Sequence, residues 1–240
     1  RGLCALAVFY AHIFLPAAAI DPVWVPSDRF WHFNLGAPAV LMFFVLSGYV
    51  IGLVTTQPAT AGHVRTYLVH RIARLGPLNT AAVLLSVLLL PQVTGRAIFG
   101  NLLFLENSEP YPGLGAFPLL FNNSNLWSLN YEAVYYLGFL SLWRFAPPTT
   151  LAFGLMAAVV AVHALGGPIS ALFARYACGA LYWLTGLAIA WHAAPVADAD
   201  RRTNWPAASL AFLAIWQLAP LRALFYDLKL SGWLWMTSQG

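Results

Sequence analysis

Apolar runs about as long as a bilayer is thick dominate this sequence and restrict the folds open to it. A helix needs about 20 apolar residues to cross the hydrocarbon core. Seven runs of this kind are present, at residues 1–20, 36–54, 77–94, 127–144, 151–166, 176–194 and 205–224. An eighth begins near residue 230. We therefore expect an all-α fold, a polytopic transmembrane helix bundle with seven to eight spans.

Composition agrees with this fold class and excludes others. Of the 240 residues, 60% are hydrophobic and 8% are charged, about a third of the charged share in soluble domains. This excludes an ordinary soluble globule, and a disordered chain is excluded because it would be poor in apolar residues. The net charge of +4 comes from cations scattered singly or in pairs, whereas nucleic-acid binding needs a clustered basic patch. The expected partner is a lipid bilayer and not a nucleic acid.

The distribution of Lys and Arg between the connecting loops orients the predicted bundle. One set of alternate loops carries seven of these cations and the other set carries five. By the positive-inside rule, residues 55–76 face the cytoplasm and residues 95–126 face the outer side. The cytoplasmic segment is predicted to hold a short helix that leads to Gly76-Pro77, where the third span begins.

The cysteines and histidines predict neither a disulfide framework nor a metal site. Cys4 and Cys178 both fall within apolar runs, so we expect them to be core residues. No two of the six histidines have the spacing typical of metal ligands. We therefore expect no metal.

The first apolar run carries two polar groups on one face. Arg1 and His12 are eleven residues apart, and at about 100° per residue they project from almost the same side of a helix, roughly 16 Å apart. A central ionisable residue costs about 2.5–3.5 kcal/mol on insertion scales and marks a functional site by default. The alternative is structural: Arg1 reaches the interface, and His12 hydrogen-bonds a neighbouring helix.

Two further segments hold candidate binding residues, each with a plainer interpretation. Ser47-Gly48-Tyr49 interrupts the second apolar run, where small residues either line a passage or let helices pack closely. Arg71 and Arg74, three residues apart, share a helix face in the cytoplasmic segment. They form either a two-pronged site for phosphate or a positive-inside anchor.

The fourth apolar run opens at its outer end with three polar groups. Trp127 suits the membrane interface, and Ser128 and Glu132, four residues apart, face the same way. A carboxylate one turn inside an apolar helix needs a partner. His12 and Glu132 are the two proton-active groups expected in the outer half of the membrane, and their spacing leaves open whether they face each other.

Four segments, taken together and in order, resemble the membrane-bound acyltransferase family 3, the bacterial integral-membrane O-acyltransferases of surface polysaccharides. RGLCALAVFYAH resembles the family's element of an arginine, ten residues and a histidine, and FFVLSGYVIG resembles its FFVLSGF stretch. HRIARLGPL resembles its RxxR segment, and LWSLNYEAVYYL resembles its WSLxxE element, with Ala133 in place of a second acidic residue. The resemblance covers residues 1 to about 140.

The resemblance implies a domain, a location and a reaction. It predicts a single integral-membrane acyltransferase domain over residues 1–240, a truncated ten-span domain incomplete at both ends. Proteins of this kind lie in the bacterial inner (cytoplasmic) membrane and cross it several times. The implied enzyme moves an acyl group other than aminoacyl, acetyl by preference, from cytoplasmic acyl-CoA to a hydroxyl of an extracytoplasmic glycan or related acceptor. Acyl-CoA is then a substrate, and no permanently bound cofactor is expected.

The same resemblance assigns catalytic roles to three residues. His12 is the general base that removes the proton from the acceptor hydroxyl, a task suited to an imidazole whose pKa lies near neutrality. Arg1 is a further cation near the donor, deeper in the site than Arg71 and Arg74. Glu132 either orients or charge-stabilises His12, or binds sugar hydroxyls. The implied substrate-binding and donor-binding residues are Arg71, Arg74, Ser47, Tyr49, Trp127 and Ser128.

Two other functions stay open at this point. A transporter or channel component would use Arg1, His12 and Glu132 in a solute or proton path, although the sequence shows no inverted pair of broken helices. A non-catalytic fragment is the other alternative. Within acyl transfer, no GxSxG pattern surrounds Ser47 or Ser128, so direct transfer is favoured over a covalent relay. The acceptor, the acyl length and the oligomeric state are left open.

Overall fold

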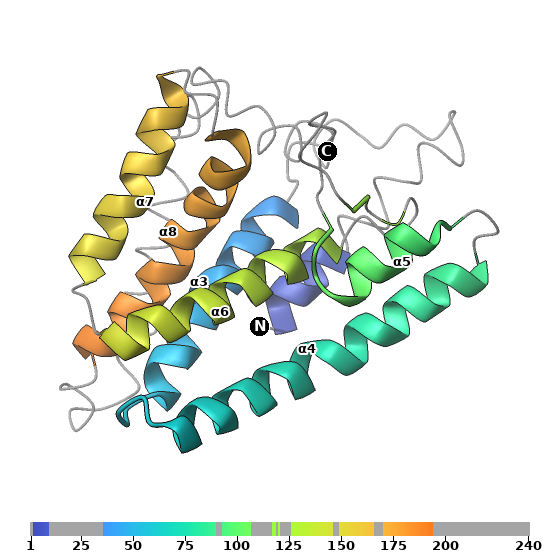
Figure 1. Ribbon diagram of the computed structural model, residues 1–240. Helices are drawn as coiled ribbons and strands as arrows, with labels where there is room; N and C mark the ends of the chain where they lie inside the picture. The colour runs from blue at the N-terminus through green and yellow to red at the C-terminus, as the bar shows by residue number, and fades with distance from the viewer. Residues whose placement is uncertain are drawn as a thin grey trace. The chain divides into compact units, whose positions relative to one another are not determined.

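The computed structural model describes residues 2–9, 36–89, 93–106, 117–118, 120, 126–145, 149–165 and 170–193. Within these residues every element is a helix (Figure 1), which confirms the all-α prediction. A helical segment covers residues 2–9. The helices that follow are α3 (Gly36–Val54), α4 (Ala61–Leu89), α5 (Gly95–Leu102), α6 (Trp127–Phe145), α7 (Thr149–Ala164) and α8 (Ser170–Ala193).

Most predicted spans that fall on described residues coincide with a helix. The helices α3, α6 and α7 match the predicted spans to within two residues at either end, and α8 begins earlier than its span, at Ser170. The span predicted at 1–20 is described only over residues 2–9. The span at 205–224 and the run near residue 230 lie outside the described residues.

The prediction for the third span is wrong in one respect. A short helix was expected to lead to Gly76-Pro77 and a span to start there, but α4 is a single helix of 29 residues with Pro77 inside it. Proline normally disfavours helical backbone at the preceding residue, because the proline Cδ clashes with the Cβ of that preceding residue. Because Gly76 has no Cβ, that clash is reduced and the helix continues. Arg71 and Arg74 therefore lie within a long helix.

The helix α4 has polar groups on its buried face and apolar groups on its exposed face. Its buried residues are Tyr67, Leu75, Asn79, Val83 and Ser86. Its exposed side chains include Ile72, Leu78, Leu84, Leu85 and Leu88. A soluble helix shows the opposite distribution, so this one is suited to lipid.

Length and apolar composition also suit α4 to a membrane. It is long and apolar enough to cross a bilayer, and three shorter apolar helical stretches accompany it among the described residues: Ala39–Val54, Thr149–Ala164 and Tyr176–Trp191. The bundle of seven to eight spans stays a prediction.

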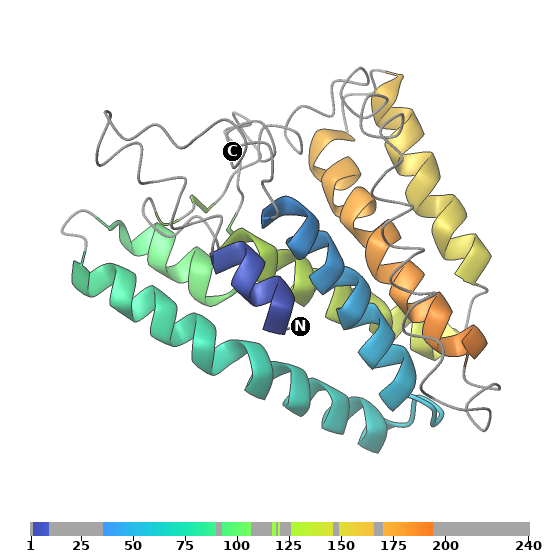
Figure 2. The same cartoon turned by 180° about the vertical axis from the view of Figure 1, so that it is seen from behind.

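The chain divides into two compact units, residues 1–55 with 149–240 and residues 56–148. In the first unit, α8 packs against both α3 and α7 (Figures 1 and 2). Cys178 lies in the core between α7 and α8 with Val160 and Ala174, as predicted for that cysteine. Cys4 is half-buried.

Glycines allow α3 and α8 to approach closely. A Cβ placed on Gly48 would lie well inside 3.0 Å of the Trp183 carbonyl oxygen, and a Cβ on Gly186 would do the same to the Val45 carbonyl oxygen. Both obstacles are backbone atoms, which cannot turn away. The glycine of the Ser47-Gly48-Tyr49 segment is therefore a packing residue, as small residues in membrane helices often are.

In the second unit, α4 and α6 run antiparallel. Tyr67 contacts Phe139 with ring centroids 5.5 Å apart, and Arg74 contacts Glu132. From Tyr67 to Arg74 the chain advances seven residues along α4, while from Phe139 to Glu132 it goes back seven residues along α6, so the two helices run in opposite directions. At the far end of the pair, the Trp143 indole N–H donates to the Gln57 carbonyl at 2.8 Å. The Asn79 amide joins α4 to α5 by donating to the Asn101 carbonyl at 2.7 Å.

The close approach of α3 and α8 predicts opposite effects for two Gly→Ala substitutions. Gly48→Ala places a methyl group against backbone and should destabilise the protein by about 1–3 kcal/mol. Gly154→Ala in α7, where nothing lies within 4 Å of the added Cβ, should stabilise it by about 0.5–1 kcal/mol because Gly is a poor helix former. Thermal unfolding of the two variants in the same detergent measures both effects, and a neutral Gly48→Ala would contradict the packing.

Candidate functional site

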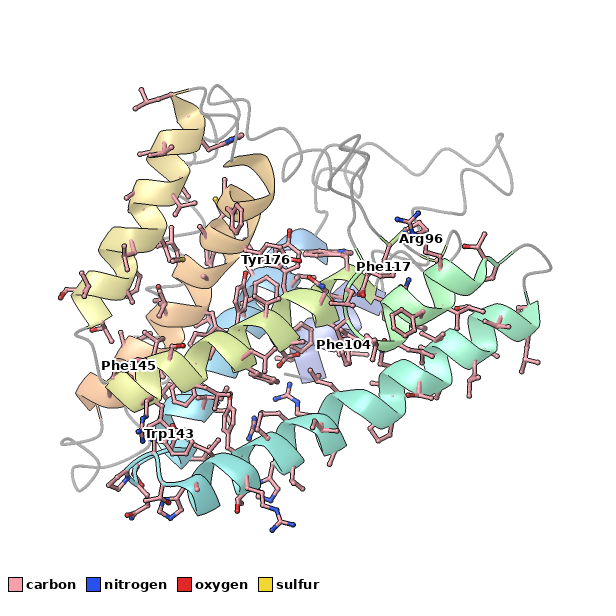
Figure 3. The ribbon with its side chains drawn as sticks, viewed as in Figure 1. Arg96, Phe104, Phe117, Trp143, Phe145 and Tyr176 are labelled. Atoms are coloured by element: carbon pink, nitrogen blue, oxygen red, sulfur yellow. The ribbon has the colours of Figure 1, made fainter. Side chains whose placement is uncertain are left out.

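The packing of α4 on α6 brings five polar and aromatic side chains together, which we call the arginine cluster: Tyr67, Arg71, Arg74, Glu132 and Tyr136. Both helices contribute residues about one turn apart, which therefore share a face. Figure 3 shows Trp143 at the end of α6 near the start of α4. The cluster lies in the second unit alone.

Glu132 is held by two donors on one oxygen. The Arg74 Nη2 atom lies 2.9 Å from Glu132 Oε1, and the Tyr136 hydroxyl donates to the same oxygen. The side chains of Arg74 and Glu132 are 33% and 13% exposed. An ion pair that stays partly open to solvent contributes about 1 kcal/mol or less to stability. The pair is therefore only moderately strong.

Arg71 is held by aromatic rings. Its guanidinium carbon lies 5.4 Å from the centroid of the Tyr67 ring and 5.3 Å from that of Tyr136, within the range of cation–π attraction. The rings meet edge to face, and the Tyr67 hydroxyl donates to the Tyr136 carbonyl at 3.0 Å. In the part of the chain that the structure describes, Arg71 forms no ion pair, and its buried Nε lacks a hydrogen-bond partner.

The charges of the arginine cluster do not balance. Among the described residues, two guanidinium groups face one carboxylate, which leaves one net positive charge, and that charge lies on Arg71. The aromatic contacts orient the Arg71 guanidinium without neutralising it. Arginine's planar fork matches the oxygens of phosphate and carboxylate groups. The cluster is thus suited to bind an anion, with Arg71 as its first contact.

Comparison with known proteins identifies the family. A family model described as an acyltransferase domain matches residues 1–239. This chain belongs to acyltransferase family 3. No curated protein and no solved structure matches the chain. The match confirms the family resemblance seen in the four sequence segments, and it makes the protein an acyltransferase in the general sense of that family.

In this acyltransferase family 3 protein, the RxxR and WSLxxE segments meet. They were predicted to lie at different depths, with Arg71 and Arg74 at the cytoplasmic side and Glu132 towards the outer side. The direct contact of Arg74 with Glu132 shows that this separation is wrong. The physical reason is the continuity of α4, which carries Arg74 to its middle and so to the level of Glu132.

The remaining predicted residues lie elsewhere. Arg1 and His12 are outside the described residues. Ser47, which is 1% exposed, and the half-buried Tyr49 lie on α3 in the first unit. Trp127 and Ser128 are half-buried in the first turn of α6, where Trp127 meets Tyr131 edge to face at 5.3 Å.

Sequence reasoning missed Tyr67 and Tyr136, although a usable signal was present. Tyr67 lies four residues before Arg71, and Tyr136 lies four residues after Glu132. This is the spacing at which helical side chains meet. A search for aromatic residues one turn away from intramembrane charges would have found both.

A second unusual carboxyl follows α5. The helix ends at Leu102, and Phe104, just after the C-cap Leu103, has a φ of 57°, a left-handed conformation usually taken by Gly. The Leu105 N–H bonds to the Gly100 carbonyl at 2.8 Å, and the Asn130 side-chain amide of α6 donates to the Phe104 carbonyl. Two residues later, Glu106 is 2% exposed, and no other residue that the structure describes forms a hydrogen bond with its carboxyl oxygens.

Burial raises the pKa of Glu106 from 4.5 to about 8, and a hydrogen bond to its own backbone offsets this only partly. A buried carboxylate without a partner is unfavourable, so the group stays protonated at neutral pH. Phe104 and Glu106 together place a strained backbone and a neutral carboxyl within three residues. Such features are often found at functional sites.

The raised pKa of Glu106 predicts how stability changes with pH. Between pH 4.5 and 8 the folded state binds more protons at this group than the unfolded state, so the unfolding free energy falls as pH rises, by about 1.4 kcal/mol per pH unit from this group. Glu106→Gln removes this loss. We expect the variant to gain stability over the parent protein between pH 5.5 and pH 7.5, as measured by thermal unfolding in detergent. A difference that does not change with pH would contradict the assignment.

Proposed function

We propose that this protein is a multi-pass enzyme of the bacterial inner membrane that moves an acyl group from cytoplasmic acyl-CoA to a hydroxyl of an extracytoplasmic glycan or related acceptor. Acetyl is the expected acyl group. The observation that carries the proposal is the arginine cluster, whose uncompensated Arg71 suits the phosphates of coenzyme A. Membership of acyltransferase family 3 supports the reaction class.

Donor binding follows from the charge and geometry of the cluster. Coenzyme A carries phosphate groups. These are multiply charged, and their oxygens accept hydrogen bonds from the planar guanidinium fork of arginine. Arg71 is oriented by Tyr67 and Tyr136 before any anion arrives, so little side-chain entropy is lost on binding. Arg74, held by Glu132, supplies the second arm of the site.

The chemical step is a direct transfer. In this proposal His12 takes the proton of the acceptor hydroxyl while the hydroxyl oxygen attacks the thioester carbonyl carbon. A carbon–oxygen bond forms, the carbon–sulfur bond breaks, and the departing thiolate of coenzyme A receives the proton from His12. Arg1 stabilises the donor end. General base catalysis of this kind contributes about 10²–10⁴ in rate.

The other proposed residues complete the substrate path. Ser47 and Tyr49 on α3 are proposed to contact substrate, and so are Trp127 and Ser128 at the start of α6. The contact of Glu132 with Arg74 supports a role for this carboxylate at the donor phosphates. The leucine-covered exposed face of α4 supports a position in the bilayer.

Substitutions of His12 and Arg71 test the proposal through different kinetic constants. We expect His12→Ala to lower kcat by about 10²–10⁴, and Arg71→Ala to raise KM for acetyl-CoA at least tenfold, since a charged hydrogen bond contributes about 1.5–3 kcal/mol. Labelled acetyl-CoA is supplied to membranes that contain the full-length protein, with peptidoglycan or lipopolysaccharide as acceptor in separate reactions.

The helix that carries Arg71, α4, also offers a histidine and an arginine as control positions. His63→Ala and Arg65→Ala change exposed residues near the start of α4 and should leave both constants unchanged. Transfer that survives His12→Ala would contradict the general base. Solute flux without acylation in the parent protein would instead support a transporter.

A further inference from the structure

We propose that the Glu132 carboxylate competes with the donor's phosphate groups for Arg74. The carboxylate holds this arginine until a phosphate group displaces the carboxylate. This inference rests on the proposed binding of acyl-CoA and adds an exchange of anions to it. It gives Glu132 a positioning role in donor binding: the carboxylate leaves Arg74 only when a stronger anion bridges Arg71 and Arg74.

The two arginines approach the same aromatic ring, which places both within reach of one extended anion. They lie one turn apart on α4, and their guanidinium carbons lie 5.3 Å and 6.0 Å from the centroid of the same Tyr136 ring. A diphosphate has oxygens on two phosphorus atoms and two or more charges, so it can accept from both guanidinium groups at once. Glu132 contacts Arg74 through one oxygen. The diphosphate therefore satisfies more donors than the carboxylate does.

The accessibility of the Arg74–Glu132 pair permits the exchange. A third of the Arg74 side chain is exposed, so the pair is not enclosed by protein and an incoming anion can reach it. A phosphate group carries more charge than a carboxylate and accepts charge-assisted hydrogen bonds on several oxygens. A phosphate bound to both arginines thus outcompetes Glu132, whereas a singly charged small anion gains too little.

Tyr136 limits the cost of releasing the carboxylate. Its hydroxyl donates to the same Glu132 oxygen as Arg74 does, and its backbone carbonyl is fixed by the Tyr67 hydroxyl at 3.0 Å. After displacement, Glu132 keeps the Tyr136 hydroxyl as a donor and is not left as an unpaired charge.

The competition predicts opposite effects for two conservative variants. Glu132→Gln keeps the size of the side chain and removes the competing charge, so pyrophosphate and coenzyme A should bind about fivefold to tenfold more tightly. Tyr136→Phe keeps the aromatic ring and removes the donor that receives the displaced carboxylate, so both ligands should bind more weakly. Binding is measured by isothermal titration calorimetry on the full chain in lipid nanodiscs, with monodispersity checked for each variant.

A double variant separates the local exchange from a general change in charge. If Glu132 acts through Arg74, then Glu132→Gln should give no gain in affinity when Arg74→Ala is already present. A gain that persists in the Arg74→Ala background would overturn the proposal. So would a Glu132→Gln affinity equal to or below that of the parent protein, or a parent protein and variants that fail to bind pyrophosphate.

The two ligands separate this inference from the proposed function. An Arg74-dependent gain for pyrophosphate, with no coenzyme A binding, would uphold the anion exchange and reject acyl-CoA as the donor. Acyl transfer by the parent protein, with no gain in the Glu132→Gln variant, would uphold the enzyme and reject the exchange.

Discussion

The ion pair between Arg74 and Glu132 is the interaction on which the second unit depends. Arg74 lies in the middle of a 29-residue apolar helix, where a central arginine costs about 2.5–3.5 kcal/mol on insertion scales. The carboxylate of Glu132 and the ring of Tyr136 offset part of that cost. Because each charge requires the other, α4 and α6 are fixed in one register, and Tyr67 is brought to Phe139 at the same time.

The two units solve the problem of helix packing with different residues. In the first unit Gly48 and Gly186 bring α3 and α8 into backbone contact, so van der Waals packing holds the pair. In the second unit polar and aromatic side chains join the helices, as between Asn79 and Asn101. Apolar surface remains exposed in both units, as expected of helices whose surroundings are lipid.

The sequence was sufficient to predict the helices and the residue types of the site. The runs that became α3, α6 and α7 were visible because apolar length determines a membrane helix. Glu132 was visible because charge within an apolar run is costly and rare, and Arg71 and Arg74 were visible because two arginines one turn apart share a helix face. These features depend on local composition alone.

The contacts between helices could not be predicted in the same way. Pairing of Arg74 with Glu132 depends on the register of α4 against α6, which no single helix specifies. The continuity of α4 was missed because the effect of Pro77 depends on the residue before it, and Gly76 relieves the clash. The burial of Glu106 was missed because it follows from a turn at Phe104 that α6 holds in place.

A double-mutant cycle on the Arg74–Glu132 pair tests the central claim most directly. The unfolding free energies of the parent protein, Arg74→Gln, Glu132→Gln and the double variant are measured in one detergent. The structure predicts that the two substitutions are not additive, with a favourable coupling energy of about 1 kcal/mol between the residues. Additive effects within about 0.3 kcal/mol would show that the residues do not interact, and would contradict the packing of α4 on α6 on which the arginine cluster rests.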